Sequence, residues 1–155
     1  MRSSRESGEG SGKRHLKVFV DANIIVSGLA FEGNEALLLK LGAVGLCRLV
    51  TTRYVMEEVA RVLRAEEFRL KPDELTSLLS FVRRCMEIHE GVKWEELSEY
   101  LPRLDDEKDV HVLAAFERLN CDILVTGDKK LLRKVRKAKT TRQTLNRLLG
   151  KDSED

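Results

Sequence analysis

Short, wholly apolar segments alternate along this chain with longer helix-like segments, and this alternation restricts the fold more than any other feature. The segments LKVFVD (16–21) and DILVT (122–126) lack the polar–apolar alternation of a strand with one solvent-exposed face. Strands of this kind are covered on both faces, as in the parallel sheets of α/β proteins. CRLVTT (47–52) is a third expected strand.

Helical segments with recognisable start signals separate these strands. Gly33 and Asn34 precede one segment, Thr52 caps the next, and Pro72 opens the third. The expected helices cover residues 34–44, 52–68, 72–88, 94–101, 109–119 and 128–135, before a short polar stretch and TRQTLNRLL. Strands that alternate with helices predict a three-layer α/β/α sandwich around a mainly parallel central sheet.

The length of 155 residues, with 42% apolar and 35% charged residues, is that of one globular domain. We expect this domain at residues 16–150, between a flexible tail (1–15) and a polar C-terminal end (151–155). No apolar run is long enough for a membrane span, and the first fifteen residues lack a signal-peptide core. A cytoplasmic protein that does not bind membranes is expected. The three cysteines, Cys47, Cys85 and Cys121, are odd in number and widely spaced, so we expect them to be reduced residues of the core.

Two acidic residues follow expected strands directly. Asp21 closes the first strand, and Asp128 is separated from ILVT by one glycine. Ligands of parallel α/β sheets bind outside the carboxyl ends of the strands, so both side chains are candidates for a site. The alternative for Asp128 is a simple helix cap.

Two further acids lie on the apolar stripes of helices. Helical spacing turns Glu58 inward and leaves Glu57 outward, although a structural salt bridge would also explain an inward Glu58. Asp109 shares a face with apolar residues of its helix; Asp106, one turn earlier, either joins the site or caps the helix. Converging carboxylates repel one another unless a cation or protons neutralise them, so the four acids together predict a divalent metal site.

The ordered segments VDANIIVSG, TTRYVMEEVARVL, DDEKDVHVLAAF and DILVTGDKKLL resemble the PIN-domain nucleases, from about Lys17 to Leu149. The resemblance implies a metal-dependent ribonuclease of the kind found as the toxin in toxin-antitoxin pairs. The resemblance implies that the family's four acids correspond to Asp21, Glu58, Asp109 and Asp128. It also implies that two polar residues, Asn23 and Thr126, support the site. The closing segment KVRKAKTTRQTLNRLL departs from the family, because it is more basic and less apolar than the usual last strand and helix.

Carboxylate oxygens suit Mg²⁺ or Mn²⁺, which would activate water for attack on an RNA phosphodiester. The resemblance implies products with a 5′-phosphate and a 3′-hydroxyl, and as partners RNA, an antitoxin protein and a second copy of the chain. No cysteine or histidine cluster requires a covalent nucleophile. His111 is two residues from Asp109 and on a different helix face, so whether it contacts substrate stays open.

The stretch from Lys129 to Lys151 holds ten Lys or Arg residues and no acid. It is either a solvated face or an RNA-binding patch, for which the candidates are Lys129, Lys130, Arg133 and Arg136. Aromatic residues are few, so base-stacking platforms are not expected. Two other functions fit the pattern less well: a catalytically silent RNA-binding or scaffold module, and a phosphoaspartyl receiver or phosphatase, which would leave Glu58 unexplained.

Overall fold

The computed structural model describes residues 15–151, so the predicted tail and C-terminal end lie outside the described part except for His15 and Lys151. A five-stranded sheet forms the middle layer, with strand order β4-β3-β2-β5-β6 and every neighbouring pair parallel. The strands are β2 (Lys17–Val20), β3 (Arg48–Thr52), β4 (Met86–His89), β5 (Ile123–Val125) and β6 (Ala138–Lys139). The expected α/β sandwich is confirmed.

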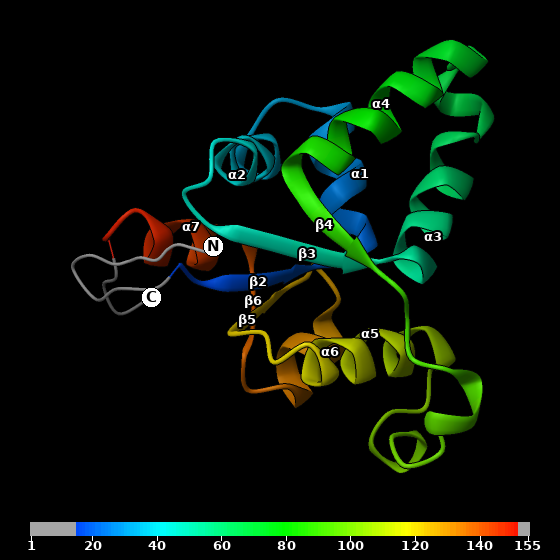
Figure 1. Ribbon diagram of the computed structural model, residues 1–155, viewed down its shortest axis with the longest axis vertical. Helices are drawn as coiled ribbons and strands as arrows, with labels where there is room; N and C mark the ends of the chain where they lie inside the picture. The colour runs from blue at the N-terminus through cyan, green and yellow to red at the C-terminus, as the bar shows by residue number, and fades with distance from the viewer. Residues whose placement is uncertain (1–14, 152–155) are drawn as a thin grey trace, which may run out of the picture.

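Helices cover both faces of this sheet (Figure 1). One face carries α1 (Ala22–Ala30), α2 (Asn34–Ala43), α3 (Arg53–Leu63) and α4 (Pro72–Cys85). The other face carries α5 (Glu107–Arg118) and α6 (Lys129–Lys134), while α7 (Thr141–Leu148) packs against α2. Single turns of 3₁₀ helix lie at Glu66–Phe68, Trp94–Glu96 and Leu101–Arg103. No helix within residues 15–151 is long and apolar enough to cross a membrane.

The central strand β2 is fully buried at Val18, Phe19 and Val20, as expected for a strand covered on both faces. Close packing around it depends on small residues. A Cβ added at Gly42 in α2 would lie 2.5 Å from the Cys85 carbonyl oxygen and from a Leu49 methyl group. The absence of a side chain there lets α2 approach β3 and the end of α4.

Strand order places the candidate site. The chain runs from β2 outward to β3 and β4, then returns across the sheet to β5 and β6 on the other side of β2. Loops leaving β2 and β5 therefore diverge to opposite faces and open a crevice at their carboxyl ends. Asp21 and Asp128 follow these two strands.

Five local predictions need correction. The helix expected over 94–101 is replaced by single turns of 3₁₀ helix at Trp94–Glu96 and Leu101–Arg103. Residues 22–30 form α1, which we had not expected because the apolar run of the strand continues into it. The helix expected over 52–68 ends at Leu63. Residues 86–88, expected as the end of a helix, form β4 because Met86 to His89 pair with β3. The polar stretch before α7 contains β6, which pairs with β5.

Candidate active site

Asp21 lies at the centre of the site, where β2 ends and α1 begins. Its Oδ1 atom accepts a hydrogen bond from the Ala22 backbone N–H at 2.8 Å, which caps α1. Its Oδ2 atom accepts a 2.7 Å hydrogen bond from the Thr126 hydroxyl, one strand away. Asp21 is 3% exposed, and burial raises its pKa, opposed by the hydrogen bonds from Thr126 and Ala22. The carboxylate is held rigidly by groups that favour its charged form.

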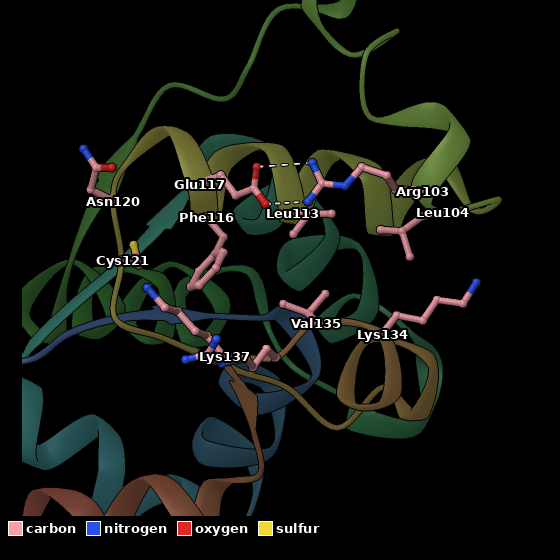
Figure 2. A pocket seen from close by; sticks show the side chains of 11 residues that line it. Arg103, Leu104, Leu113, Phe116, Glu117, Asn120, Cys121, Lys134, Val135 and Lys137 are labelled. Atoms are coloured by element: carbon pink, nitrogen blue, oxygen red, sulfur yellow. Dashed lines mark hydrogen bonds and ion pairs between the residues drawn. The ribbon is translucent and has the colours of Figure 1, made fainter.

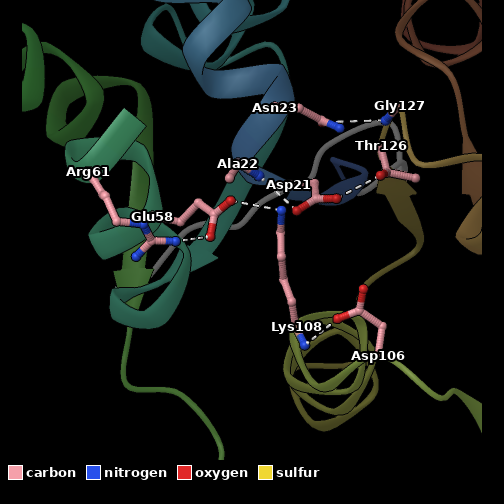
Figure 3. A network of polar contacts seen from close by, with 9 residues as sticks. All are labelled: Asp21, Ala22, Asn23, Glu58, Arg61, Asp106, Lys108, Thr126 and Gly127. Carbon is pink, nitrogen blue, oxygen red and sulfur yellow. Dashed lines mark hydrogen bonds and ion pairs between the residues drawn. The ribbon is translucent and has the colours of Figure 1, made fainter. Parts of the chain in front are cut away.

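Thr126 joins the two strand-end acids. Its Oγ1 atom donates to Asp21 and accepts a 3.0 Å hydrogen bond from the Asp128 backbone N–H. Asn23 supports the same loop, since its Oδ1 atom accepts a hydrogen bond from the Gly127 N–H at 3.4 Å (Figure 3). These contacts connect the first turn of α1 to the loop after β5. Asn23 and Thr126 thus hold the loop after β5 against the start of α1.

Asp128 is the N-cap of α6. Its Oδ1 atom accepts hydrogen bonds from the Lys130 and Leu131 backbone N–H groups at 2.8 and 3.2 Å. The capping role considered from the sequence is thus real, and it involves only one carboxylate oxygen. Asp128 is half-buried, and its charge helps raise the pKa values of both Asp21 and Asp109.

Asp109 has the least satisfied carboxylate in the site. It lies in the first turn of α5, is 3% exposed, and its buried Oδ2 atom has no hydrogen-bond partner among the described residues. Burial, with the charges of Asp128 and Asp106, raises the pKa of Asp109 to about 6. A buried polar oxygen without a partner is costly, so this atom is suited to receive a cation or a proton.

Glu58 is the fourth acid, and its side chain is 18% exposed whereas Glu57 is exposed, as the helical spacing predicts. It forms ion pairs with Lys108 at 2.7 Å and with Arg61 at 2.6 Å. Figure 3 shows Lys108 reaching from α5 between Glu58 and Asp21. The Glu58 hydrogen bond raises the pKa of Lys108, and the Asp21 and Asp109 charges add to this effect.

Lys130 was expected to contact RNA, but in the structure its ammonium group faces the acids. It lies 3.8 Å from Asp105, 3.8 Å from Asp106 and 3.9 Å from Asp109. Asp106 caps α5 by accepting a hydrogen bond from the Lys108 N–H at 3.0 Å. Asp106 therefore both caps the helix and borders the site.

Sequence reasoning missed Lys108, the second ammonium group among the acids. Its nearest partner, Glu58, is 50 residues away along the chain, so no local spacing indicates the contact. Both lysines partly neutralise the carboxylates that would otherwise repel one another.

No group of three or more His, Cys, Asp or Glu side chains within residues 15–151 is arranged as a ready-made metal cage. The chemistry of the donors nevertheless fits a divalent cation. Asp21, Asp109 and Asp128 supply hard oxygen atoms, and the orphaned Oδ2 atom of Asp109 is one to which a cation would give a partner. Lys108 and Lys130 contribute positive charge to the same space.

Part of the basic stretch lies apart from the acids. Lys134, Arg136 and Lys137 line a pocket of about 670 Å³ between α5 and the segment after α6 (Figure 2). Across the pocket, Arg103 forms an ion pair with Glu117 at 2.6 Å. Other lining residues follow the end of α5, before β5 begins, so the pocket lies toward the opposite end of the strands from Asp21.

The family model described as PIN domain matches residues 17–130. The chain therefore belongs to the PIN-domain family, whose members are generally nucleases. No curated protein matches it.

Solved structures share the fold. The crystal structure of PAE2754 from Pyrobaculum aerophilum is 20% identical, with a TM-score of 0.65 over 87% of this chain and 96% of the other. VapBC2 from Rickettsia felis, crystallised with a DNA fragment from its promoter, is 16% identical, with a TM-score of 0.61 over 81% of this chain and 98% of the other.

Proposed function

We propose that this protein is a metal-dependent endoribonuclease that hydrolyses RNA phosphodiester bonds. The observation that carries the proposal is the buried Asp109 carboxylate, whose Oδ2 atom has no hydrogen-bond partner within residues 15–151 and whose pKa is raised, at the crevice that also holds Asp21 and Asp128. Such an arrangement lowers the stability of the fold, and residues with perturbed pKa values are concentrated at functional sites. Membership of a family of nucleases supports the same conclusion.

The acids differ in their proposed roles. Asp21, Asp109 and Asp128 would hold Mg²⁺ or Mn²⁺, with Glu58 bordering them from α3. The bound ion would supply an activated water and would stabilise the leaving oxygen. Thr126 and Asn23 keep Asp21 and the loop after β5 in fixed orientation through the hydrogen bonds described above. We expect a 5′-phosphate and a 3′-hydroxyl on the products.

The two lysines among the acids, Lys108 and Lys130, would help the site to accept RNA. A cluster of carboxylates repels RNA phosphates, whereas Lys108 and Lys130 reduce its net charge. When an ion occupies the carboxylates, the lysine ammonium groups become available to phosphate oxygens. Lys130 would thus contact RNA at the site itself, while the exposed residues Lys129, Arg133 and Arg136 would contact RNA further along the strand.

Partners of the protein follow from the same proposal. The R. felis neighbour is by its title a VapBC complex, and we infer that this chain is likewise the toxin of a toxin-antitoxin pair. An antitoxin protein, a second copy of the chain and a cytoplasmic location are then expected.

The deciding experiment compares purified wild type with Asp21→Asn and Asp128→Asn on a labelled RNA, with Mg²⁺, Mn²⁺ or chelator. We expect both variants to lose cleavage by at least about 100-fold while keeping their fold by circular dichroism, because the charge that holds the ion is removed. Glu57→Gln is the matched control, since its side chain is exposed. Full cleavage by Asp21→Asn, or by wild type in chelator, would contradict the mechanism.

A second candidate function is a catalytically silent RNA-binding module. The ion pairs of Lys108 with Glu58 and of Lys130 with Asp109 favour it, because they neutralise the acids without a metal. Calorimetric titration with Mn²⁺ separates the two functions: the nuclease requires saturable binding that Asp21→Asn weakens. RNA binding without any Mn²⁺ binding would establish the silent module.

A further inference from the structure

Three aromatic rings from distant parts of the sequence gather beside the candidate active site. Tyr54, in the first turn of α3, stacks on His111 of α5, with ring centroids 3.8 Å apart and planes inclined by 13°. Trp94, from the loop between β4 and α5, lies 6.3 Å from the His111 ring at 34°. The scarcity of aromatic residues in the composition gave no indication of this cluster.

The cluster borders the acids. Tyr54 precedes Glu58 by one helical turn, so the two side chains share a face of α3. Burial raises the pKa of Tyr54, and the nearest charges acting on it include Glu107, Glu58 and Lys108. His111 follows Asp109 by two residues in the first half of α5. The rings therefore adjoin the Glu58–Lys108 ion pair at the rim of the site.

The outer ring is free for a further contact. Trp94 is 62% exposed, an unusual state for the largest aromatic side chain, whereas the His111 side chain is only 13% exposed. His111 is the ring that neighbours both of the others. The stacked Tyr54 and His111 rings lie beside Trp94, whose indole is exposed to solvent.

We propose that Trp94, supported by the His111–Tyr54 stack, is a platform on which a nucleobase of single-stranded RNA stacks next to the cleavage site. This inference rests on the proposed function and names the form of RNA that the site accepts. An unpaired base can stack on an aromatic side chain whatever its sequence, whereas a base inside a duplex is already stacked and out of reach. The site would thus favour unpaired RNA segments without strong base preference.

The charges around Trp94 are consistent with a contact to the nucleobase rather than to the phosphate backbone. Lys93 and Glu95 flank Trp94 in the sequence, and Glu96 forms an ion pair with Arg118 at 3.3 Å, so this loop offers no excess of positive charge to phosphates. Cations flank the stack on α3 instead, where the side chains of Arg53 and Arg61 are 65% and 69% exposed. A strand could place its base on Trp94 and its phosphates toward α3 and the acids.

Trp94 is the only tryptophan in the chain, so its fluorescence reports on the platform directly. Wild type is titrated at low salt with a short unstructured RNA oligonucleotide, in chelator and again with Mg²⁺, and cleavage is followed in the Mg²⁺ samples. We expect saturable quenching with the single strand and little change with a duplex of the same sequence. Absence of quenching while cleavage proceeds would overturn the platform and leave the nuclease standing.

Variants test the same point through labelled-RNA anisotropy. Trp94→Ala should weaken single-strand affinity by roughly tenfold, and Trp94→Phe should restore most of it, because base–aromatic stacking depends on a ring. Phe31→Ala is the matched control, since Phe31 is 65% exposed and lies outside the stack. Equal affinities for wild type and Trp94→Ala would refute the platform.

Two further outcomes separate this proposal from the function on which it rests. Quenching by RNA without any cleavage supports the platform and refutes the hydrolytic function. Quenching by an arginine-rich peptide but not by RNA overturns the platform and makes Trp94 part of a protein-binding surface. Neither quenching nor cleavage with any RNA overturns both proposals.

Discussion

Asp109 has a buried carboxylate without a full set of partners, so its ionisation links the site to folding. Its folded-state pKa of about 6 lies above the ordinary value of 3.8. Folding therefore favours the protonated form. The stability that this group contributes is fully present below about pH 3.8 and is lost as the pH rises through about 6.

Asp109→Asn should accordingly raise the melting temperature of the metal-free protein at pH 7, by roughly 2–4 °C for each kcal/mol of relieved repulsion. The gain should shrink as the pH falls from 7 to 4, because wild-type Asp109 then becomes neutral as well. Thermal melts in chelator at several pH values measure both effects. Asp105→Asn is the control, since that side chain is 85% exposed; identical pH dependence in wild type and Asp109→Asn would contradict the assignment.

Glu58 and Glu57 are neighbours in sequence with opposite surroundings. Glu58→Gln should lower the rate of RNA cleavage by roughly 10- to 100-fold, because it weakens the ion pair with Lys108 and removes a charge at the rim of the metal site. Glu57→Gln should change the rate by less than about twofold. Parallel cleavage assays at saturating Mn²⁺ decide the question. Equal losses in the two variants would show that Glu58 has no special place in the site.

At the scale of elements, α6 divides the basic stretch between two environments. In its first turn, Lys130 points toward the acids, whereas Lys129 and Arg133 lie on its exposed face. The pocket against α5 is lined by Lys134, the last residue of α6, and by Arg136 and Lys137 beyond it. The stretch is therefore not one continuous patch, and the RNA contacts are proposed for Lys129, Arg133 and Arg136, which are all exposed.

Replacing Lys129, Arg133 and Arg136 together with alanine should weaken RNA binding and reduce its salt dependence. The slope of log affinity against log salt should fall by roughly 0.7 for each lost phosphate contact on a single strand. Replacing the exposed Arg64, Arg83 and Arg84 with alanine removes the same charge elsewhere and serves as the control. Equal slopes in both triple variants would mean that Lys129, Arg133 and Arg136 belong to a solvated face.

At the scale of the whole molecule, the acids that meet at the crevice come from both sides of the sheet. Asp21 follows the central strand, Asp109 lies on the helix layer below it, and Glu58 lies on the layer above it (Figure 1). An ion held by all of them would link the layers, so metal binding should stabilise the folded protein as a unit.

Mn²⁺ should therefore raise the melting temperature of wild type in a concentration-dependent manner. The expected gain is about 2.7 kcal/mol when the free metal is 100 times its Kd. Asp21→Asn should abolish most of this gain, whereas Glu57→Gln should keep it. Differential scanning calorimetry at increasing Mn²⁺ measures the shift without reference to activity. A shift of the same size in Asp21→Asn would place the metal elsewhere.

The sequence by itself determined those features that depend on neighbouring residues. Apolar runs without alternation identified β2 and β5, because strands covered on both faces are predominantly apolar. The segment CRLVTT indicated β3. Helical spacing separated Glu58 from Glu57, and the end of each strand located Asp21 and Asp128. These patterns involve residues that are close together in the sequence, so they can be recognised before the fold is known.

Only the tertiary structure decided the features that depend on residues far apart. Met86 to His89 form a strand because β3 lies beside them, although their local pattern continues the preceding helix. Lys108 meets Glu58 across 50 residues, and Tyr54, His111 and Trp94 meet from three segments. Pairing, ion contacts and ring stacking act over a few ångströms in space, which sequence spacing does not record beyond a single helix or strand.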